Sequence, residues 1–482
     1  MTAQILSELL AILGPQGLIS TPDEMRTYEN DALTNFRVMP EAVVLPTSTE
    51  QVQAVLRICH RERIPFVARG SGTGLSGGAL PVTGGIVVSL ARMKRILEVD
   101  FENQRMVVEP GVINLDVTAR VASRGYFYAP DPSSQSVCSI GGNVAENAGG
   151  AHCLKYGFTT THVLGLEVVL ADGTLVHMGS QTLDAPGYDL PGVFVGSEGT
   201  LGVATKVTLR IVKRPEFVQT LLAAFASTNE AGAAVSGIIA AGMLPAAIEM
   251  MDTLAIEAAE AAVHANYPPC GGLLLVELDG PVAEVATLME EVAAICRANG
   301  TSEIRVSKND EERMLVWKGR KAAFAAMGRL SPNYIVQDGV IPRTALPAIL
   351  SEMEQLSAAA GLRVANVFHA GDGNLHPLVL YDRRIEGQEK AAEQLAERIL
   401  ELCIEKGGSI TGEHGVGEEK KHMMGKMYAE PDLATMNRLR CAFDPLSLAN
   451  PTKVFPRPRM CGEQPGEYKP HPIEIAGLAE RY

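Results

Sequence analysis

The sequence predicts an α+β fold built in two parts, and three observations support this prediction. The chain has 482 residues, which is enough for two or three domains with cores of ordinary size. Short β-rich runs broken by glycine fill residues 40–214. After Arg214-Pro215 the pattern changes to alanine-rich helices that alternate with strands, and no internal repeat is visible.

The first part is interpreted as an α+β nucleotide-binding domain. Near its start, Leu6, Leu9, Leu10 and Leu13 recur at helical spacing, which predicts one apolar face of an amphipathic helix. A further helix is expected over Thr49–Arg61. The expected strands are short and apolar, and they cover Ala42–Leu45, Pro65–Ala68, Gly85–Leu90, Met106–Glu109, Val163–Leu170 and Val203–Ile211.

The second part is predicted to hold a sheet with helices on one face, because strands and helices alternate from residue 219 to 306. The strand Gly272–Leu278 is an uninterrupted apolar run. The uncharged run Ala231–Ile248 contains glycines and a proline, so it is expected to form a buried helix rather than a membrane span. The expected helices cover Glu230–Gly242, Val282–Asn299 and Gln388–Lys406, and the tail after Met460 is expected at the surface.

Composition and charge exclude several classes of protein. The apolar share of 46% excludes a wholly disordered chain, and the net charge of −14 argues against a protein that binds the nucleic-acid backbone. The eight cysteines are scattered without any Cys-x-x-Cys pair, which excludes a local iron–sulfur site and suits a reducing compartment. The N-terminus lacks the basic region of a secretion signal, so we expect a soluble, cytoplasmic protein without direct membrane insertion.

Glycine is enriched in a first loop that follows an expected strand. Gly72, Gly74 and Gly77 satisfy the spacing of a dinucleotide fingerprint, but the residues that follow cannot form the helix which that fingerprint requires. Backbone N–H groups wrapped around an anion such as a pyrophosphate fit the loop better, and a flexible surface loop is the alternative. The candidate binding residues are Arg69, Gly70, Ser71, Gly72, Thr73, Gly74, Ser76 and Gly77.

Two more glycine-rich stretches follow in the same part of the chain. Residues 131–150 carry almost no bulky side chains, so a flat ring could lie directly against their backbone, and residues 196–203 lead into a strand. Three such loops predict one long cofactor that threads between them. Their candidate residues are Asp131, Ser134, Gly141, Gly142, Asn143, Ala148, Gly149, Gly150, Glu198 and Val203.

Histidines and an acid gather near the C-terminus. His369 and His376 flank a Gly-Asp-Gly turn, which suits a hairpin that brings both rings to one point, and Glu413-His414 follows between glycines. Two imidazoles and a carboxylate can hold a divalent cation, although a structural histidine pair is the alternative. In a regular strand Glu413 and His414 would face opposite sides, and so could serve a metal and a substrate separately. Arg320 is a candidate for binding a carboxylate through its planar fork.

These motifs, in this order, resemble those of the vanillyl-alcohol-oxidase-type flavoproteins, in their FAD-linked 2-hydroxy-acid dehydrogenase branch. That branch includes the FAD-binding subunit of bacterial glycolate oxidase, the D-lactate dehydrogenases and the D-2-hydroxyglutarate dehydrogenases. The resemblance implies an FAD-binding domain over residues 1–214 and a cap domain with an antiparallel sheet over residues 215–440. The remaining residues, 441–482, would return to the FAD domain.

The resemblance also implies roles for particular residues. The first glycine loop would hold the FAD pyrophosphate, and Asn450 would lie near the flavin. His369, His376 and Glu413 would bind a divalent metal, for which zinc is the first choice and manganese or iron the alternatives. His414 would be the catalytic base and Arg320 the carboxylate anchor. Because the first loop contains no histidine, FAD is expected to be non-covalent.

The resemblance therefore predicts that a small 2-hydroxy acid, glycolate or D-lactate, is oxidised to the 2-oxo acid by hydride transfer to flavin N5. Electrons would leave through an iron–sulfur subunit and a second flavoprotein-like subunit, which could hold the chain at the periphery of the inner membrane. The alternatives are a D-lactate or D-2-hydroxyglutarate dehydrogenase acting alone, a non-catalytic flavin-carrying assembly subunit, or a metallohydrolase built on the histidine cluster.

Overall fold

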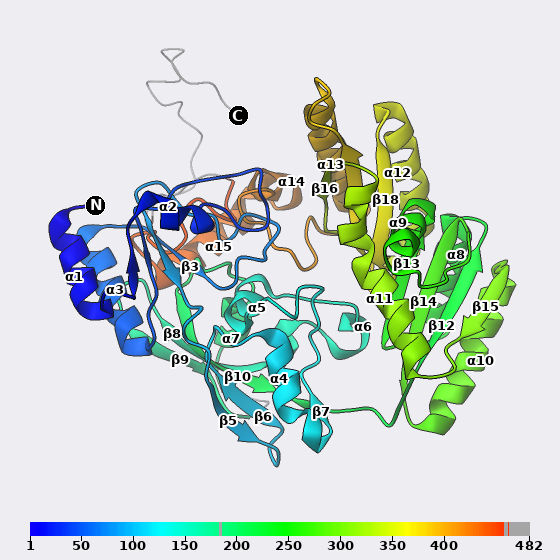
Figure 1. The fold of residues 1–482 in the computed structure, drawn as a ribbon, viewed down its shortest axis with the longest axis horizontal. Helices are drawn as coiled ribbons and strands as arrows, with labels where there is room; N and C mark the ends of the chain where they lie inside the picture. Colours follow the sequence, from blue (N-terminus) through cyan, green and yellow to red (C-terminus); the bar gives the residue numbers. More distant parts are fainter. Residues whose placement is uncertain (183–185, 457–460, 462–482) are drawn as a thin grey trace.

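The computed structural model describes residues 1–182, 186–456 and 461, and it has two α+β bodies joined in sequence (Figure 1). The first body contains the N-terminal half of the chain and holds two larger sheets and one two-stranded sheet. The second is organised around one large antiparallel sheet. This is the α+β architecture that the sequence predicts. The predicted surface position of the tail after Met460 falls outside the described residues, Cys461 excepted.

The first body is built from short strands, as predicted. In one sheet, with order β1-β2-β4-β3, the last three strands run parallel, and a second, antiparallel sheet has the order β5-β6-β10-β8-β9. The strands are β1 (Leu18–Ile19), β2 (Ala42–Val44), β3 (Phe66–Arg69), β4 (Ile86–Ser89), β5 (Ile96–Asp100), β6 (Arg105–Val108), β8 (Val163–Val169), β9 (Leu175–Gly179), β10 (Val203–Arg210) and the small pair β7 (Tyr126–Phe127) and β11 (Val212–Lys213).

Helices pack around these two sheets. The N-terminal helix forms, but its buried face carries Ile5 and Leu9, and Leu10 is 44% exposed, so the prediction of one four-leucine face was wrong. Ile5 and Leu9 are four residues apart and lie on one side, whereas Leu10 is turned away by the next 100° step. The helices are α1 (Ala3–Leu13), α2 (Pro22–Met25), α3 (Thr49–Glu62), α4 (Asn114–Val121), α5 (Ile140–Glu146), α6 (Cys153–Tyr156) and α7 (Leu190–Phe194).

The second body contains a sheet with the order β15-β12-β14-β13-β18-β19-β17, to which β20 and β16 are joined beside β18. Its strand pairs are antiparallel throughout the described residues. The strands are β12 (Phe217–Phe225), β13 (Ala247–Asp252), β14 (Gly272–Gly280), β15 (Glu303–Val306), β16 (Asn333–Val336), β17 (Gly339–Val340), β18 (Arg363–His369), β19 (Asn374–Leu375) and β20 (Pro377–Tyr381).

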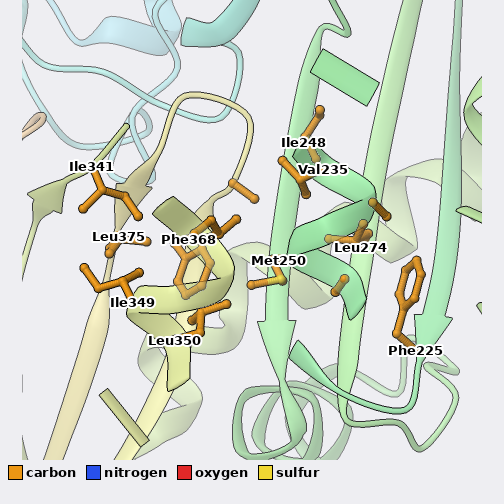
Figure 2. Close-up of a cluster of buried hydrophobic side chains, with 14 of the residues drawn as sticks. Phe225, Val235, Ile248, Met250, Leu274, Ile341, Ile349, Leu350, Phe368 and Leu375 are labelled. Atoms are coloured by element: carbon orange, nitrogen blue, oxygen red, sulfur yellow. The ribbon is translucent and has the colours of Figure 1, made fainter. Parts of the chain in front are cut away.

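Helices cover both faces of this sheet, so the prediction of one covered face was wrong. Leu274 and Leu273 are neighbours in β14, and they belong to two different apolar clusters on opposite faces. An uninterrupted apolar strand is the pattern expected when both faces are buried. Figure 2 shows the larger cluster, in which Phe225, Met250 and Phe368 lie among helix side chains. The helices are α8 (Thr228–Ala240), α9 (Thr253–Val263), α10 (Val282–Ala298), α11 (Asp310–Ala326), α12 (Leu346–Ala360) and α13 (Gln388–Glu405).

The uncharged run Ala231–Ile248 is not one buried helix, because α8 ends at Ala240 and the run continues through a turn into β13. Gly242 has a φ of +77°, a left-handed conformation that ends a helix at low cost when glycine supplies it. Within the described parts of the chain, no helix combines the length and the apolar character needed to cross a bilayer.

After the second body, called the cap from here on, the chain returns to the first body through α14 (Met424–Met427) and α15 (Glu430–Phe443). Figure 1 shows these helices beside the N-terminal elements. Ala449 extends the first sheet as an isolated parallel bridge to Phe66. The return also brings Cys441 and Cys461 together as a disulfide, with Cα atoms 5.5 Å apart. The scattered cysteine spacing did not predict this pair.

Candidate active site

The three glycine-rich loops converge on one cavity of about 450 Å³ between the two bodies. The cavity is lined by residues of all three loops, by α11 of the cap and by the histidine cluster. Of the residues predicted to bind the cofactor, those that line it are Arg69, Gly70, Ser71, Gly72, Thr73, Gly74, Ser134, Gly141, Gly142, Asn143, Ala148, Gly149, Glu198 and Val203.

Glycines, which have no side chain, keep this cavity open. A Cβ added to Gly74 or Gly199 would meet no protein atom closer than 3.8 Å, so any side chain there would extend into the cavity. Gly72 and Gly199 both have a φ of +71°, which L-residues rarely adopt. Exposed backbone from three separate loops around one cavity fits an extended cofactor with a flat ring and an anionic linker. The lining therefore fits FAD.

The other residues predicted to bind the cofactor lie beside the cavity and do not line it. The Asn450 side chain donates hydrogen bonds to the carbonyls of Gly78 at 2.8 Å and Glu198 at 2.6 Å, which ties the first loop to the third. The Ser76 carbonyl accepts hydrogen bonds from the backbone of Glu418 and Glu419. Gly77 and Gly150 both have positive φ, and Asp131 accepts a hydrogen bond from His152 at 2.9 Å.

Arg69 precedes the first loop and is buried. It donates from Nη1 to the carbonyl of Asn30 at 2.7 Å, and its guanidinium lies over the ring of Tyr28. Burial lowers the pKa of Arg69, an effect that Asp31 opposes. This arrangement fixes the end of β3 and the start of the loop.

The predicted hairpin brings His369 and His376 together. Their ring centroids lie 5.1 Å apart, and Glu413 Oε1 lies 3.5 Å from His369 Nε2 and 3.0 Å from His376 Nε2. Their other ring nitrogens are already engaged: His369 Nδ1 lies 2.7 Å from Glu249, and His376 Nδ1 lies 3.3 Å from the Gln337 carbonyl. Outer partners of this kind orient metal-binding histidines, so the donor set fits a divalent cation.

Electrostatics at this cluster are dominated by burial and by opposite charges. Burial alone would lower the pKa of His369, but Glu249 and Glu413 outweigh it and raise that pKa well above its usual value. Burial alone would raise the pKa of Glu413, yet the two histidines hold it well below its usual value. The carboxylates therefore favour a positive charge between them, which either a proton on His369 or a divalent cation that displaces this proton can supply.

His414 stacks on His376, with ring centroids 4.9 Å apart and ring planes 17° from parallel. Burial lowers the pKa of His414 to about 4, although Asp338 opposes the shift. At neutral pH the imidazole is therefore uncharged and can accept a proton. Glu413 and His414 lie in a bend and not in a strand, so the prediction of opposite-facing neighbours was wrong: both point toward His376.

This bend is fixed by a buried carboxylate that no sequence pattern singles out. Asp338 is fully buried and accepts backbone hydrogen bonds from Gly412, Glu413 and His414 at 3.1, 3.2 and 2.8 Å. Burial alone would raise the pKa of Asp338, but His414 and Lys420 outweigh it and lower the value to about 2. Asp338 thus holds the bend at Glu413 and His414 as an anion. Only its place immediately before the short strand β17 could have suggested a role.

Glu249 and Glu146 were also missed. Glu249 on β13 is fully buried and forms an ion pair with Arg320 at 2.5 Å, in addition to its contact with His369. Glu146 lines the cavity, and burial together with the nearby Glu198 raises its pKa well above the usual value. Its position at the end of the glycine-rich second stretch was the available signal for Glu146.

Arg320 does not line the cavity, but its neighbours Lys321 and Phe324 do. The guanidinium lies 5.8 Å from the centre of the Phe324 ring. Its Nε has no hydrogen-bond acceptor among the described residues. A donor therefore remains on Arg320 after its pairing with Glu249.

Comparison with known proteins agrees with this geometry. Residues 40–179 match the FAD binding domain family and residues 214–454 match the C-terminal domain of FAD linked oxidases. The chain is 49% identical to glycolate oxidase subunit GlcD of Escherichia coli K12 over 92% of this chain and 90% of the relative. It is 39% identical to the Bacillus subtilis protein of the same name, over 94% and 97% of the two chains.

A more distant relative is a probable mitochondrial D-lactate dehydrogenase of Danio rerio, 31% identical over 94% of this chain and 92% of that one. Among solved structures, p-cresol methylhydroxylase with substrate bound matches 94% of this chain and 96% of that chain with a TM-score of 0.80. Its identity of 18% supports a shared fold only. The family matches and the cavity lead to one conclusion: the chain belongs to the FAD-linked oxidases and is an FAD-dependent oxidoreductase with the two-domain fold of the vanillyl-alcohol-oxidase type.

Proposed function

We propose that this protein oxidises a small 2-hydroxy acid, glycolate or D-lactate, to the corresponding 2-oxo acid. The observation that carries the proposal is the composition of one cavity wall: uncharged His414, with His369 and Glu413, lines the same cavity as the three glycine loops. The names of the relatives, glycolate oxidase subunit and D-lactate dehydrogenase, support this substrate class.

In this proposal the cavity residues hold FAD without a covalent bond, and the first loop contributes no histidine to such a bond. Bound FAD supplies the acceptor for the hydride that leaves the substrate carbon. The bare backbone at Gly72 and Gly74 leaves room for the anionic linker, and Asn450 keeps the first and third loops in register.

His369, His376 and Glu413 would hold the divalent cation. Nitrogen and carboxylate donors suit zinc first, and manganese or iron as alternatives. A cation held there supplies Lewis-acid polarisation of the substrate hydroxyl. Glu249 and the Gln337 carbonyl keep the two Nε2 atoms pointed at the site through their contacts with the opposite ring nitrogens.

His414 would take the hydroxyl proton as general base, a role worth about 10²–10⁴-fold in rate. Its Nε2 lies 3.8 Å from Glu413 Oε1, so the base and the metal ligand act at one place. Arg320 would bind the substrate carboxylate through the Nε that its pairing with Glu249 leaves free. Asp338 positions the bend that carries His414 and Glu413.

We further propose that residues 1–214 form the FAD domain, residues 215–440 the cap, and the rest a returning segment. Val416 and Gly417 already donate backbone hydrogen bonds to Glu198 of the first body, so the return begins before α15. Because the relatives are named as subunits, we propose an assembly with an iron–sulfur subunit and a second flavoprotein-like subunit, in the cytoplasm or at the periphery of the inner membrane.

The test is anaerobic bleaching of the bound flavin. Protein purified with its flavin should lose the oxidised flavin absorbance when glycolate or D-lactate is added without oxygen. Bleaching by D-2-hydroxyglutarate alone would favour that alternative substrate. A yellow protein that none of the three acids reduces would favour a non-catalytic flavin carrier, and a colourless protein with metal-dependent hydrolase activity would contradict the proposal altogether.

A further inference from the structure

A second cavity, of about 580 Å³, adjoins the flavin cavity at α11. Lys321 lines both of them. The second cavity also contains Arg313, Trp317 and Lys318 of the same helix, and His152 from the first body. We call this second cavity the entrance cleft.

The entrance cleft carries positive charge on a chain whose net charge is −14. Arg313, Lys318 and Lys321 are cationic, and His152 joins them because Asp131 and Glu277 outweigh its burial and raise its pKa to about 10. Three carboxylates pair with these groups: Asp131, Glu277 and the exposed Asp310, which lies 3.2 Å from Arg313 Nε. Of these, Glu277 lines the cleft itself. A cleft lined mainly by one sign of charge concentrates ligands of the opposite sign.

Asp131 and Glu277 already accept hydrogen bonds, Asp131 from His152 at 2.9 Å. Glu277 accepts from Thr220 at 2.7 Å and from Trp317 at 2.5 Å, and it also lies 3.0 Å from His152 and 3.4 Å from Arg313. These contacts leave Glu277 little capacity to neutralise anything else.

The two lysines, in contrast, make few contacts that would neutralise their charge. Lys321 Nζ lies 3.6 Å from Asp131, beyond hydrogen-bond distance, and its side chain is 36% exposed. The exposed Lys318 has no ion pair or side-chain hydrogen bond within the described residues. The two lie three residues apart on α11, so they share one side of the helix, and Lys321 is the one nearer the flavin cavity.

We propose that the entrance cleft is the route by which the anionic substrate reaches the flavin cavity, with Lys318 making the first contact and Lys321 the second. This inference rests on the proposed function, because it takes the substrate to be a small carboxylate. It adds two positioning residues to the site and assigns a role to a surface that the chemistry at His414 does not use. A pair of ordinary solvated lysines is the alternative.

The experiment measures the second-order rate constant for anaerobic flavin reduction by glycolate or D-lactate, at low and at high salt. Lys318→Gln and Lys321→Gln should each lower it about threefold at low ionic strength, and the double variant about tenfold. The loss should shrink as salt screens the charges. The control is Lys390→Gln on α13, an exposed lysine that lines neither cavity and removes the same charge.

Variants that match Lys390→Gln at low salt would overturn the proposal, as would a loss that salt does not reduce. Binding of oxalate, followed by the change in flavin absorbance, repeats the test without turnover. If no 2-hydroxy acid reduces the wild-type flavin, the proposed function fails. The oxalate series still decides the entrance cleft: weaker, salt-sensitive binding in the lysine variants supports it, and unchanged binding contradicts it.

Discussion

The two sides of the cavity are lined by different parts of the chain: backbone on the flavin side and ionisable side chains on the histidine side. On the flavin side the wall is backbone: Gly74 and Gly199 leave space that any side chain would fill. On the histidine side the wall consists of ionisable side chains. They are held in place by Glu249 and Asp338, which are both fully buried. The first side provides shape, and the second provides charge and proton chemistry. Substitutions on the flavin side should therefore change flavin binding, and substitutions on the histidine side should change catalysis.

The largest expected effect is the loss of turnover in His414→Ala. The flavin-side wall is untouched, so FAD should remain bound, while the rate of anaerobic flavin reduction should fall about 10²–10⁴-fold because the general base is gone. His422→Ala is the matched control, since His422 is exposed on the surface. Stopped-flow absorbance reports the rate, and flavin content reports the binding. If His414→Ala reduced its flavin at the wild-type rate, His414 would not be the general base.

Next in size is the loss of stability in Glu249→Gln. The change keeps the shape but leaves Arg320, which is 2% exposed, without its ion partner, a situation that costs about 3–5 kcal/mol. It should also weaken the metal about 10–100-fold, because His369 loses the carboxylate that orients it. Denaturant unfolding and metal content after dialysis measure the two effects. Glu257→Gln on exposed α9 surface should show neither.

Gly74→Val tests the opposite wall. The new side chain meets no protein atom closer than 3.8 Å at its Cβ, so the fold should tolerate it, but the side chain occupies the cavity. We expect flavin content to fall at least tenfold, with the unfolding midpoint of the flavin-free protein nearly unchanged. Gly328→Val, in open space on the cap, is the control. A variant that retained its full complement of FAD would show that this loop does not line the bound cofactor.

The last prediction concerns the pH dependence of stability and the contact between the two bodies, and at any one neutral pH it leaves activity unchanged. The pKa of His152 is raised to about 10 by Asp131 and Glu277, which outweigh burial. Because the folded value exceeds the usual 6.5, the stabilisation is complete below pH 6.5 and is lost as pH rises toward 10, by at most about 1.4 kcal/mol per pH unit. Thermal unfolding of the wild type should decline over that window more steeply than that of His152→Gln. Parallel curves would contradict the assignment.

The flavin side could be predicted from the sequence because its signal is local. Glycines crowd into Gly70–Gly78, and each supplies its own share of bare backbone, so no distant residue is needed to recognise the loop. The fold class followed in the same way, from strands that are themselves continuous apolar runs. What failed locally was orientation: Leu10 matched the spacing and is exposed.

The histidine side could be predicted only in part. His369, His376 and Glu413 are recognisable by type and spacing, but their supports lie far away in sequence. Glu249 precedes His369 by 120 residues, and Asp338 precedes His414 by 76. Strand pairing in the cap brings Glu249 opposite His369 across β13 and β18. A single glutamate in an apolar strand carries no mark of this role, because the ion pair exists only after the sheet has formed.

One measurement tests the separation of the two walls most directly: single-turnover flavin reduction by glycolate or D-lactate in the same preparation before and after removal of divalent metal by a chelator. The account predicts that chelation leaves the flavin bound and oxidised, and that added zinc, manganese or iron restores its reduction. If the chelated, metal-free protein reduced its flavin at the untreated rate, the proposed metal would have no part in the chemistry, and His414 alone would be left to connect the histidine side with catalysis.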